Sequence, residues 1–254
     1  MKNILLKIEY EGTGYFGWQT QRRKEKTSGR PGSPTIQETL ETLLFQILRE
    51  KVNLISSGRT DSGVHAREQA ANFKTDSKMP AGKIKKALNG LLPADIRIKS
   101  VSFVSADFHA RFSASSKVYR YFIVNFDHCP VFLRACAHHF GFPLDISLMR
   151  KEAQALIGRK DFKSFQASDK IEKNSVRRVK NVKIGKKGSL ITIDIEADGF
   201  LYNMVRNIVG TLIEVGRGKM PAGSMKKIIA AKDRRRAGPT APAKGLFLWK
   251  VNYK

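Results

Sequence analysis

Hydrophobic and polar positions alternate near the start of the chain. From residue 4 to residue 10 every even position is apolar or aromatic, whereas positions 7 and 9 are charged. This period of two predicts a strand with one buried face. Between Ile36 and Leu48 apolar residues recur at helical spacing instead. They predict an amphipathic helix that begins behind a capping box formed by Thr35 and Glu38.

The same patterns continue along the whole chain. Further strands are predicted near residues 52–56, 70–73, 96–103, 118–124, 176–184, 190–197 and 246–253. Further helices are predicted near residues 83–92, 147–157, 202–215 and 224–231. Helices interleaved with hairpin-like pairs of strands are typical of an α+β fold with a largely antiparallel sheet. We expect two mixed α/β subdomains, which comprise residues 1–108 and 109–254.

The composition points to a polyanionic partner. The 254 residues include 47 Lys and Arg against 22 Asp and Glu, which gives a net charge of +25. Such an excess favours nucleic acid first and an acidic membrane surface second. No apolar run approaches the roughly 20 residues that span a bilayer, and no secretory signal is visible. Cys129 and Cys136 form no disulfide framework, so we expect reduced thiols and a cytoplasmic protein without a membrane segment.

The segment Gly58–Ala66 holds the strongest candidate for catalysis. Two glycines enclose Arg59, Thr60 and Asp61 directly after a predicted strand. One interpretation is an ordinary Asp-Ser-Gly turn. The other is a site, because glycine lets a ligand approach the backbone closely. A lone carboxylate beside a cation is suited to act there as a nucleophile or base.

Motifs for metal and nucleotide binding are missing from the sequence. The histidines form no His-x-x-x-His pair on a predicted helix, and the acidic residues do not cluster with them. There is also no phosphate-binding loop between a strand and a helix. We therefore expect no metal site and no nucleotide cofactor.

Two further positions are candidates for binding RNA. Tyr119 shares one face of a predicted strand with Tyr121, and such a face either packs in the core or stacks single-stranded bases. Arg206 falls at the edge of the apolar stripe of the helix predicted over residues 202–215. Its guanidinium either reaches water or pairs with a carboxylate or phosphate.

In combination, these segments resemble the tRNA pseudouridine synthase A family. The matching segments follow the family's order and span nearly the whole chain: Tyr15–Gln19, Gly58–Ala66, Phe108–Phe112, Tyr119–Tyr121, Asp161–Phe165, Met204–Gly210 and Ala237–Ala243. One departure is a longer loop from Gln21 to Thr35, which carries five cations: Arg22, Arg23, Lys24, Lys26 and Arg30. The family's tRNA contacts cannot be carried over to this loop.

The resemblance implies an enzyme that isomerises uridine to pseudouridine at positions 38, 39 and 40 of the tRNA anticodon stem-loop. It places the catalytic aspartate at Asp61, an arginine that orients it at Arg206, and an arginine that helps to extrude the target base at Arg59. Tyr119 and Leu246 fall on positions that bind the uracil. The resemblance also implies a homodimer, and two RRM-like subdomains that share a continuous, largely antiparallel central sheet.

The chemistry of this isomerisation agrees with the residues. The reaction is redox-neutral, so it requires no cofactor. Asp61 would attack C1′ of the ribose or remove a proton from C2′ to give a glycal, and the sequence leaves both routes open. Two other classes stay as alternatives. A non-catalytic RNA-binding protein would need only charge and aromatic side chains, whereas a nuclease would need clustered acids or a His pair.

Overall fold

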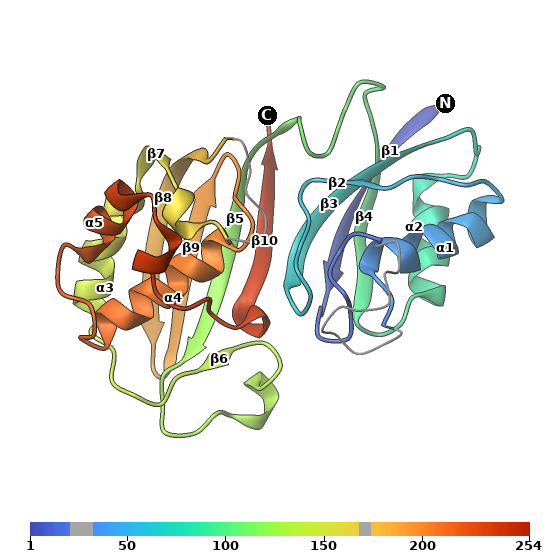
Figure 1. Ribbon diagram of the computed structural model, residues 1–254. Coiled ribbons are helices and arrows are strands. Elements are labelled where there is room, and N and C mark those ends of the chain that lie inside the picture. The colour runs from blue at the N-terminus through green and yellow to red at the C-terminus, as the bar shows by residue number, and fades with distance from the viewer. Residues whose placement is uncertain (21–32, 168–173) are drawn as a thin grey trace. The chain divides into compact units, whose positions relative to one another are not determined.

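The computed structural model describes residues 1–20, 33–167 and 174–254 (Figure 1). It divides into two compact units, of which the first comprises Met1–Ser115 with Leu248–Lys254 and the second comprises Ser116–Phe247. Most of the predicted basic loop, residues 21–32, lies outside the described residues. Each unit is described below by itself.

The boundary predicted between residues 108 and 109 differs from this division. It lies inside the first unit, which continues to Ser115 and takes back the end of the chain from Leu248 onward. The reason is strand pairing, since β10 (Leu246–Tyr253) is a neighbour of β3 (His65–Thr75) in the sheet. A boundary drawn at one point of the sequence cannot anticipate that the last residues of the chain belong to the first unit.

The first unit is a sheet with two helices on one face (Figure 1). Its strands are ordered β4–β1–β3–β10, and β2 pairs with β3. Strand β1 is antiparallel to both of its neighbours. The remaining elements are β1 (Lys2–Tyr10), β2 (Ile55–Ser56), β4 (Ile96–Val104), α1 (Ile36–Leu48) and α2 (Ala81–Leu91).

The core of the first unit follows the predicted patterns. The hydroxyl of Thr35 caps α1 by accepting from the backbone N–H of Glu38 at 3.2 Å, a contact typically worth about 1 kcal/mol. The apolar stripes of strand β1 and helix α1 are buried between the sheet and the helical layer. The fully buried members are Ile4, Leu6, Ile8, Ile36, Leu40 and Leu44.

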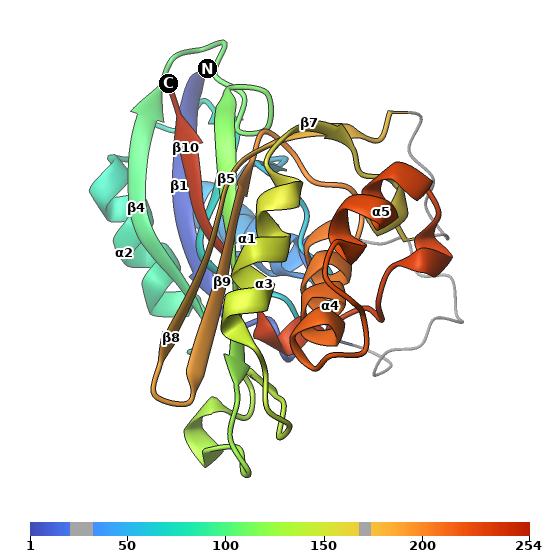
Figure 2. The ribbon, with the colours of Figure 1, turned by 90° about the vertical axis from the view of Figure 1, so that its left-hand side faces the viewer.

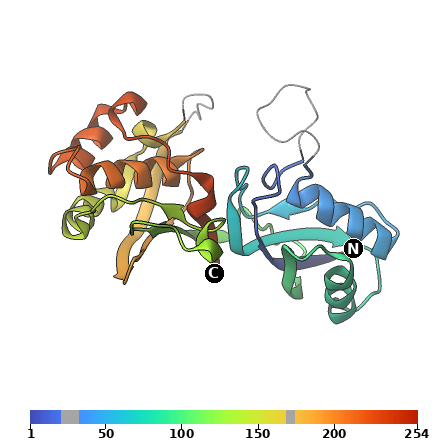
Figure 3. The same cartoon turned by 90° about the horizontal axis from the view of Figure 1, so that it is seen from below.

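The second unit is also a sheet covered by helices. Its strands are ordered β5–β9–β8–β7 with antiparallel neighbours, and β6 is parallel to β5. Figure 2 shows α3 in front of β8 and β9, and Figure 3 shows α4 and α5 on the same side of these strands. The elements are β5 (Ala114–Val124), β6 (His138–His139), β7 (Gly158–Asp161), β8 (Val176–Lys187), β9 (Leu190–Ala197), α3 (Ile146–Ala153), α4 (Met204–Gly216) and α5 (Ser224–Ala231).

Helix α4 is buried on nearly all sides. Of its 13 residues, all except Arg206 and Glu214 are buried. The sequence predicts an apolar stripe on one half of this helix, and the small or polar residues Asn207, Gly210 and Thr211 on the other half are buried as well. A helix that is enclosed in this way is a rigid support for a side chain at its edge.

The predicted α+β class with a large, mostly antiparallel sheet is confirmed, and so are the five predicted helices, with ends that shift by a few residues. The strand predicted over residues 52–56 is reduced to Ile55–Ser56, and the strand predicted near residue 70 already begins at His65. The short strands β6 and β7 are not predicted, because so few residues carry no periodic pattern. None of the helices in the described part of the chain is long and apolar enough to cross a membrane.

Candidate active site

Asp61 lies in a tight turn between β2 and β3. The backbone N–H of Val64 donates to the carbonyl oxygen of Asp61 at 3.1 Å, and Gly63 has a φ of 75°. A positive φ at this third position of the turn is typical of type II and favours glycine. The side chain of Asp61 is half-buried. The predicted Asp-Ser-Gly turn is therefore present, and it presents the carboxylate on a short, closed loop.

The segment that follows β1 supports this turn from one side. The N–H of Trp18 donates to the carbonyl oxygen of Thr60 at 3.0 Å. Gly17 has a φ of 78°, and a Cβ atom there would lie 2.4 Å from the same carbonyl oxygen. Only glycine allows so close an approach of two backbones. The residue directly before Asp61 is thus fixed by main-chain contacts.

A buried hydroxyl pair fixes the same residue through its side chain. The hydroxyl oxygens of Tyr10 and Thr60 are 2.7 Å apart, and both side chains are buried. Burial raises the pKa of Tyr10, so its hydroxyl keeps its proton at neutral pH. The pair joins the end of β1 to the turn of Asp61.

Strand β3 supports the turn from the other side. The side chain of Gln69 donates to the carbonyl oxygen of Gly58 at 2.8 Å and accepts from the hydroxyl of Ser57 at 2.7 Å. His65 is buried, and its Nδ1 accepts from the N–H of Gly12 at 3.0 Å. Because Nδ1 accepts, it carries no proton. His65 thereby joins the glycine-rich segment before Tyr15 to the end of the turn.

Arg59 lies two residues before Asp61, and its side chain is exposed. Thr60 between them is buried. The chain is therefore held through Thr60, while the preceding Arg59 leaves a cation at the surface. An exposed guanidinium at this place is suited to meet a phosphate.

Tyr119 belongs to β5 in the second unit. It is 8% exposed and lies opposite Ile195 of β9. Its ring meets that of Phe200 edge-on, with centroids 4.9 Å apart. On the other face of β5, Arg120 forms a bidentate pair with Asp194 at 2.6 and 2.7 Å. The tyrosine face of β5 is thus largely buried.

Arg206 projects from the first turn of α4 and is half-buried. Its Nε donates to the carbonyl oxygen of Ala241 at 2.7 Å, and its Nη1 donates to Oδ1 of Asn203 at 2.9 Å. The N–H of Ala241 donates in return to the carbonyl oxygen of Arg206 at 3.1 Å. The guanidinium is therefore oriented by protein acceptors and does not simply extend into water.

The segment Ala237–Gly245 runs across α4 beside Arg206. Gly210 permits this approach, because a Cβ atom there would lie 1.7 Å from the carbonyl oxygen of Pro239. The hydroxyl of Tyr121 donates to the carbonyl oxygen of Pro242 at 2.8 Å. Burial raises the pKa of Tyr121, and the charge of Arg206 acts on it in the opposite direction. Strand β5, helix α4 and this segment therefore meet around Arg206.

Leu246 begins β10 directly after this segment and is buried. A Cβ atom on the preceding Gly245 would lie 2.6 Å from Cζ of Tyr121. Within the second unit, the structure thus brings the backbone before Leu246 close to the same tyrosine that Arg206 influences. Within the first unit, Asp61 begins the turn and Arg59 lies two residues before it.

The sequence prediction missed the residues that hold these side chains. Ala241 and Asn203 orient Arg206, while Tyr10 and Gly17 hold the turn of Asp61. A signal was present for some of them, since Gly17 and Ala241 lie within segments that resemble the family. Their residue types alone, a glycine and an alanine, indicate no chemistry.

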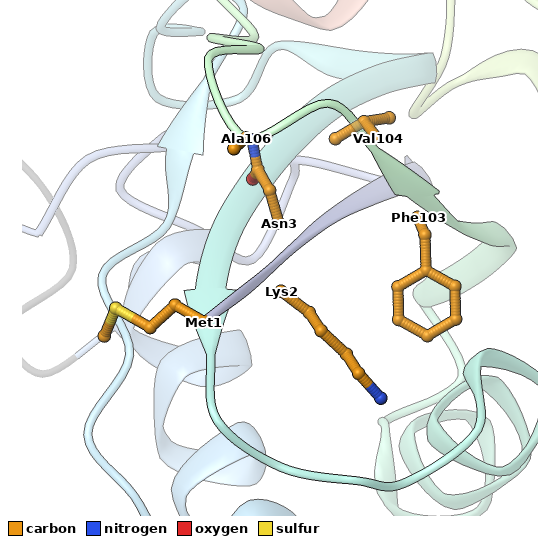
Figure 4. Close-up of a pocket in the computed structure, with 6 residues that line it drawn as sticks. All are labelled: Met1, Lys2, Asn3, Phe103, Val104 and Ala106. Carbon is orange, nitrogen blue, oxygen red and sulfur yellow. The ribbon is translucent and has the colours of Figure 1, made fainter.

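A shallow cavity of about 260 Å³ lies at the start of β1 and is lined by Met1, Lys2, Asn3, Phe103, Val104 and Ala106. Figure 4 shows the side chains of Lys2 and Phe103 next to each other, and the Lys2 ammonium lies 5.4 Å from the ring centroid. Tyr10, which contacts Thr60, is at the opposite end of this nine-residue strand. Such a strand spans nearly 30 Å at about 3.3 Å per residue, so the cavity is separate from the turn of Asp61.

Comparison with known proteins identifies the family. The sequence model of a family described as tRNA pseudouridine synthase matches residues 7–113 and 153–254. The tRNA pseudouridine synthase A of Caldicellulosiruptor bescii is 47% identical over 253 residues, and that of Thermoanaerobacter sp. (strain X514) is 44% identical over 253 residues. Both alignments cover 100% of this chain and of the relative. The fold and the matched residues define an RNA-modifying isomerase, and the chain belongs to the tRNA pseudouridine synthase family.

Proposed function

We propose that this protein isomerises uridine to pseudouridine at positions 38, 39 and 40 in the anticodon stem-loop of tRNA. The observation that carries the proposal is the full-length match to tRNA pseudouridine synthases A, together with a Gly-Arg-Thr-Asp turn that is held rigidly at both ends. The net charge of +25 supports a polyanionic substrate. We also propose that the protein acts as a cytoplasmic homodimer, as the family resemblance implies.

Asp61 is the proposed catalytic residue. Its turn fixes the backbone on both sides, so the carboxylate would meet the ribose without reordering of the loop. The carboxylate either forms a bond to C1′ as the uracil leaves, or takes the C2′ proton to give a glycal. In the first route the uracil then turns, C5 forms a bond to C1′ and the bond from C1′ to the carboxylate breaks. In the second route the uracil turns, C5 bonds to C1′ and the proton returns to C2′. In both routes the C5 proton is lost at the end and N1 gains a proton. No electrons are gained or lost, so we propose that the reaction needs no metal or other cofactor.

Arg206 is proposed to orient the ionised Asp61. Two neutral acceptors set the direction of its guanidinium, at 2.7 and 2.9 Å. A charge that is oriented before the substrate binds costs no reorganisation during the reaction. A lysine could not reproduce this arrangement, because it lacks the planar fork.

Arg59, Tyr119 and Leu246 are proposed to handle the target base. The base must leave its stack before Asp61 can reach the ribose, which costs a few kcal/mol. Arg59 is exposed beside Asp61 and would hold the extruded nucleotide through its phosphate or fill the space that the base leaves. Tyr119 and Leu246 would contact the uracil, and the aromatic and apolar nature of these two side chains suits the faces of a base.

Incubation with an unmodified tRNA transcript tests this function. We expect pseudouridine at one or more of positions 38, 39 and 40, with an intact RNA chain and no added cofactor. Cleaved RNA would favour a nuclease instead. A mobility shift without any altered nucleoside would favour a non-catalytic RNA-binding protein.

A further inference from the structure

A buried network of polar groups is centred on Asn207, the residue that follows Arg206 in α4. Asn207 is fully buried, and its Nδ2 donates to the carbonyl oxygen of Phe165 at 2.8 Å. Its Oδ1 accepts from the hydroxyl of Thr240 at 2.7 Å and from Nη2 of Arg234 at 3.0 Å. One buried amide therefore joins three separate segments of the second unit.

Arg234 and Thr211 hold the same segment at further points. Nη1 of Arg234 donates to the carbonyl oxygen of Gly238 at 2.9 Å. The hydroxyl of Thr211 accepts from the N–H of Gly238 at 2.9 Å. Gly238 is buried against the backbone of Thr211, where a Cβ atom would lie 2.8 Å from Cα. The segment that contacts Arg206 is thus fixed by side chains on both sides of Pro239.

The network ends one residue from the acceptor of Arg206. Thr240 bonds to Asn207, and Ala241 is the next residue, whose carbonyl oxygen accepts from Nε of Arg206. A displacement of Thr240 would therefore move that carbonyl. Because the Arg206 bond is 2.7 Å long and charge-assisted, its direction depends on this position.

We propose that Asn207, Thr240 and Arg234 are positioning residues that set the direction of the Arg206 guanidinium. None of them needs to contact the RNA for this role. The inference rests on the proposed function, in which Arg206 orients Asp61. It adds that the Ala237–Gly245 segment, which connects α5 to β10, also holds the guanidinium of Arg206 in a fixed direction.

The variant Thr240→Val tests this role with little risk to folding, because Thr240 is exposed. Valine keeps the shape and removes the hydroxyl. We expect kcat to fall roughly tenfold, as small misplacements of catalytic groups do, with KM for tRNA and the melting temperature unchanged. Thr240→Ser keeps the hydroxyl and should restore most of the rate.

A double-variant cycle separates positioning from general damage. In the background of Arg206→Lys, the bond from Nε to Ala241 no longer exists, so Thr240→Val should have little further effect on single-turnover rates. An equal tenfold loss in both backgrounds, or full activity of Thr240→Val, would overturn the positioning role. If Arg206→Lys itself keeps the full rate, the proposed role of Arg206 fails instead, so the two failures are distinguishable.

Discussion

Two hydrogen bonds of the Arg206 guanidinium go to neutral oxygens of its own unit. Ala241 accepts from Nε and Asn203 accepts from Nη1. A structural arginine in a core boundary usually finds a carboxylate, as Arg120 does with Asp194 at 2.6 Å. Neutral acceptors orient the guanidinium without cancelling its charge. Arg120 therefore offers a comparison for Arg206 within the same unit.

The first residue-scale prediction concerns this charge. Arg206→Lys should lower kcat roughly 100-fold, since lysine keeps the charge but loses the two oriented bonds. Single-turnover conversion of tRNA measures the effect. Arg120→Lys is the matched control in the same unit and should affect the melting temperature more than the rate. Equal rates for Arg206→Lys and the parent would show that Arg206 is not part of the chemistry.

The second residue-scale prediction concerns Tyr119. Its ring is held edge-on by Phe200 at 4.9 Å, so a role in contacting uracil should depend on the ring. Tyr119→Phe should keep the KM within about twofold, because the ring is retained, and any fall in kcat would be due to the hydroxyl. Tyr119→Leu should lose most activity. An active leucine variant would exclude stacking by this residue.

At the scale of elements, the sequence predicts most of the fold because long elements carry clear periods. In β1 the even positions 4–10 are buried while Lys7 and Glu9 are not, although Leu5 is buried as well. At the start of α1 the expected cap by the Thr35 hydroxyl is present. The turn of Asp61 can also be predicted, since its glycines enclose polar residues. Several supports of the site cannot be predicted in this way, because they are contacts of backbone atoms. Nothing in the residue type of Ala241 shows that its carbonyl accepts from Arg206, and nothing in Gly17 shows that Thr60 packs against it.

The close approach at Gly17 gives a prediction at this scale. Gly17→Ala should destabilise the protein by at least ~1 kcal/mol, because alanine is strained at a φ of 78°. Its Cβ would also displace the carbonyl of Thr60, so kcat should fall with the melting temperature. Gly14→Ala is the control, since a Cβ atom there has nothing within 4 Å. Thermal unfolding and initial rates of both variants measure this; equal behaviour would show that the turn does not need Gly17.

At the scale of the whole molecule, the charge of +25 should govern tRNA binding. Each phosphate contact adds roughly 0.7–0.9 to the slope of log affinity against log salt. The affinity for tRNA should therefore fall steeply with salt, while kcat at saturating tRNA should change much less. Filter binding and single-turnover kinetics across a salt series measure the two quantities. A flat binding curve would show that phosphate contacts contribute little.

The basic loop gives the second prediction at this scale. Replacing the five cations of the loop with glutamine should weaken tRNA binding and lower the slope of log affinity against log salt. These cations are Arg22, Arg23, Lys24, Lys26 and Arg30. The control removes the same charge from five exposed lysines in regular elements: Lys83, Lys86, Lys186, Lys187 and Lys226. A larger change for the loop variant would assign RNA contacts to the loop. Equal changes would show only a general effect of charge.

The central claim, that this molecule isomerises uridine with Asp61, is tested most directly by one measurement. Tritium release from tRNA labelled at C5 of uridine should be abolished in Asp61→Asn, which removes the charge and keeps the shape. The affinity for tRNA should stay within roughly threefold, because the turn is held by its backbone. Asp107→Asn, at an exposed position of the same unit, should keep the full rate. Sustained tritium release by Asp61→Asn at the rate of the parent would contradict the account.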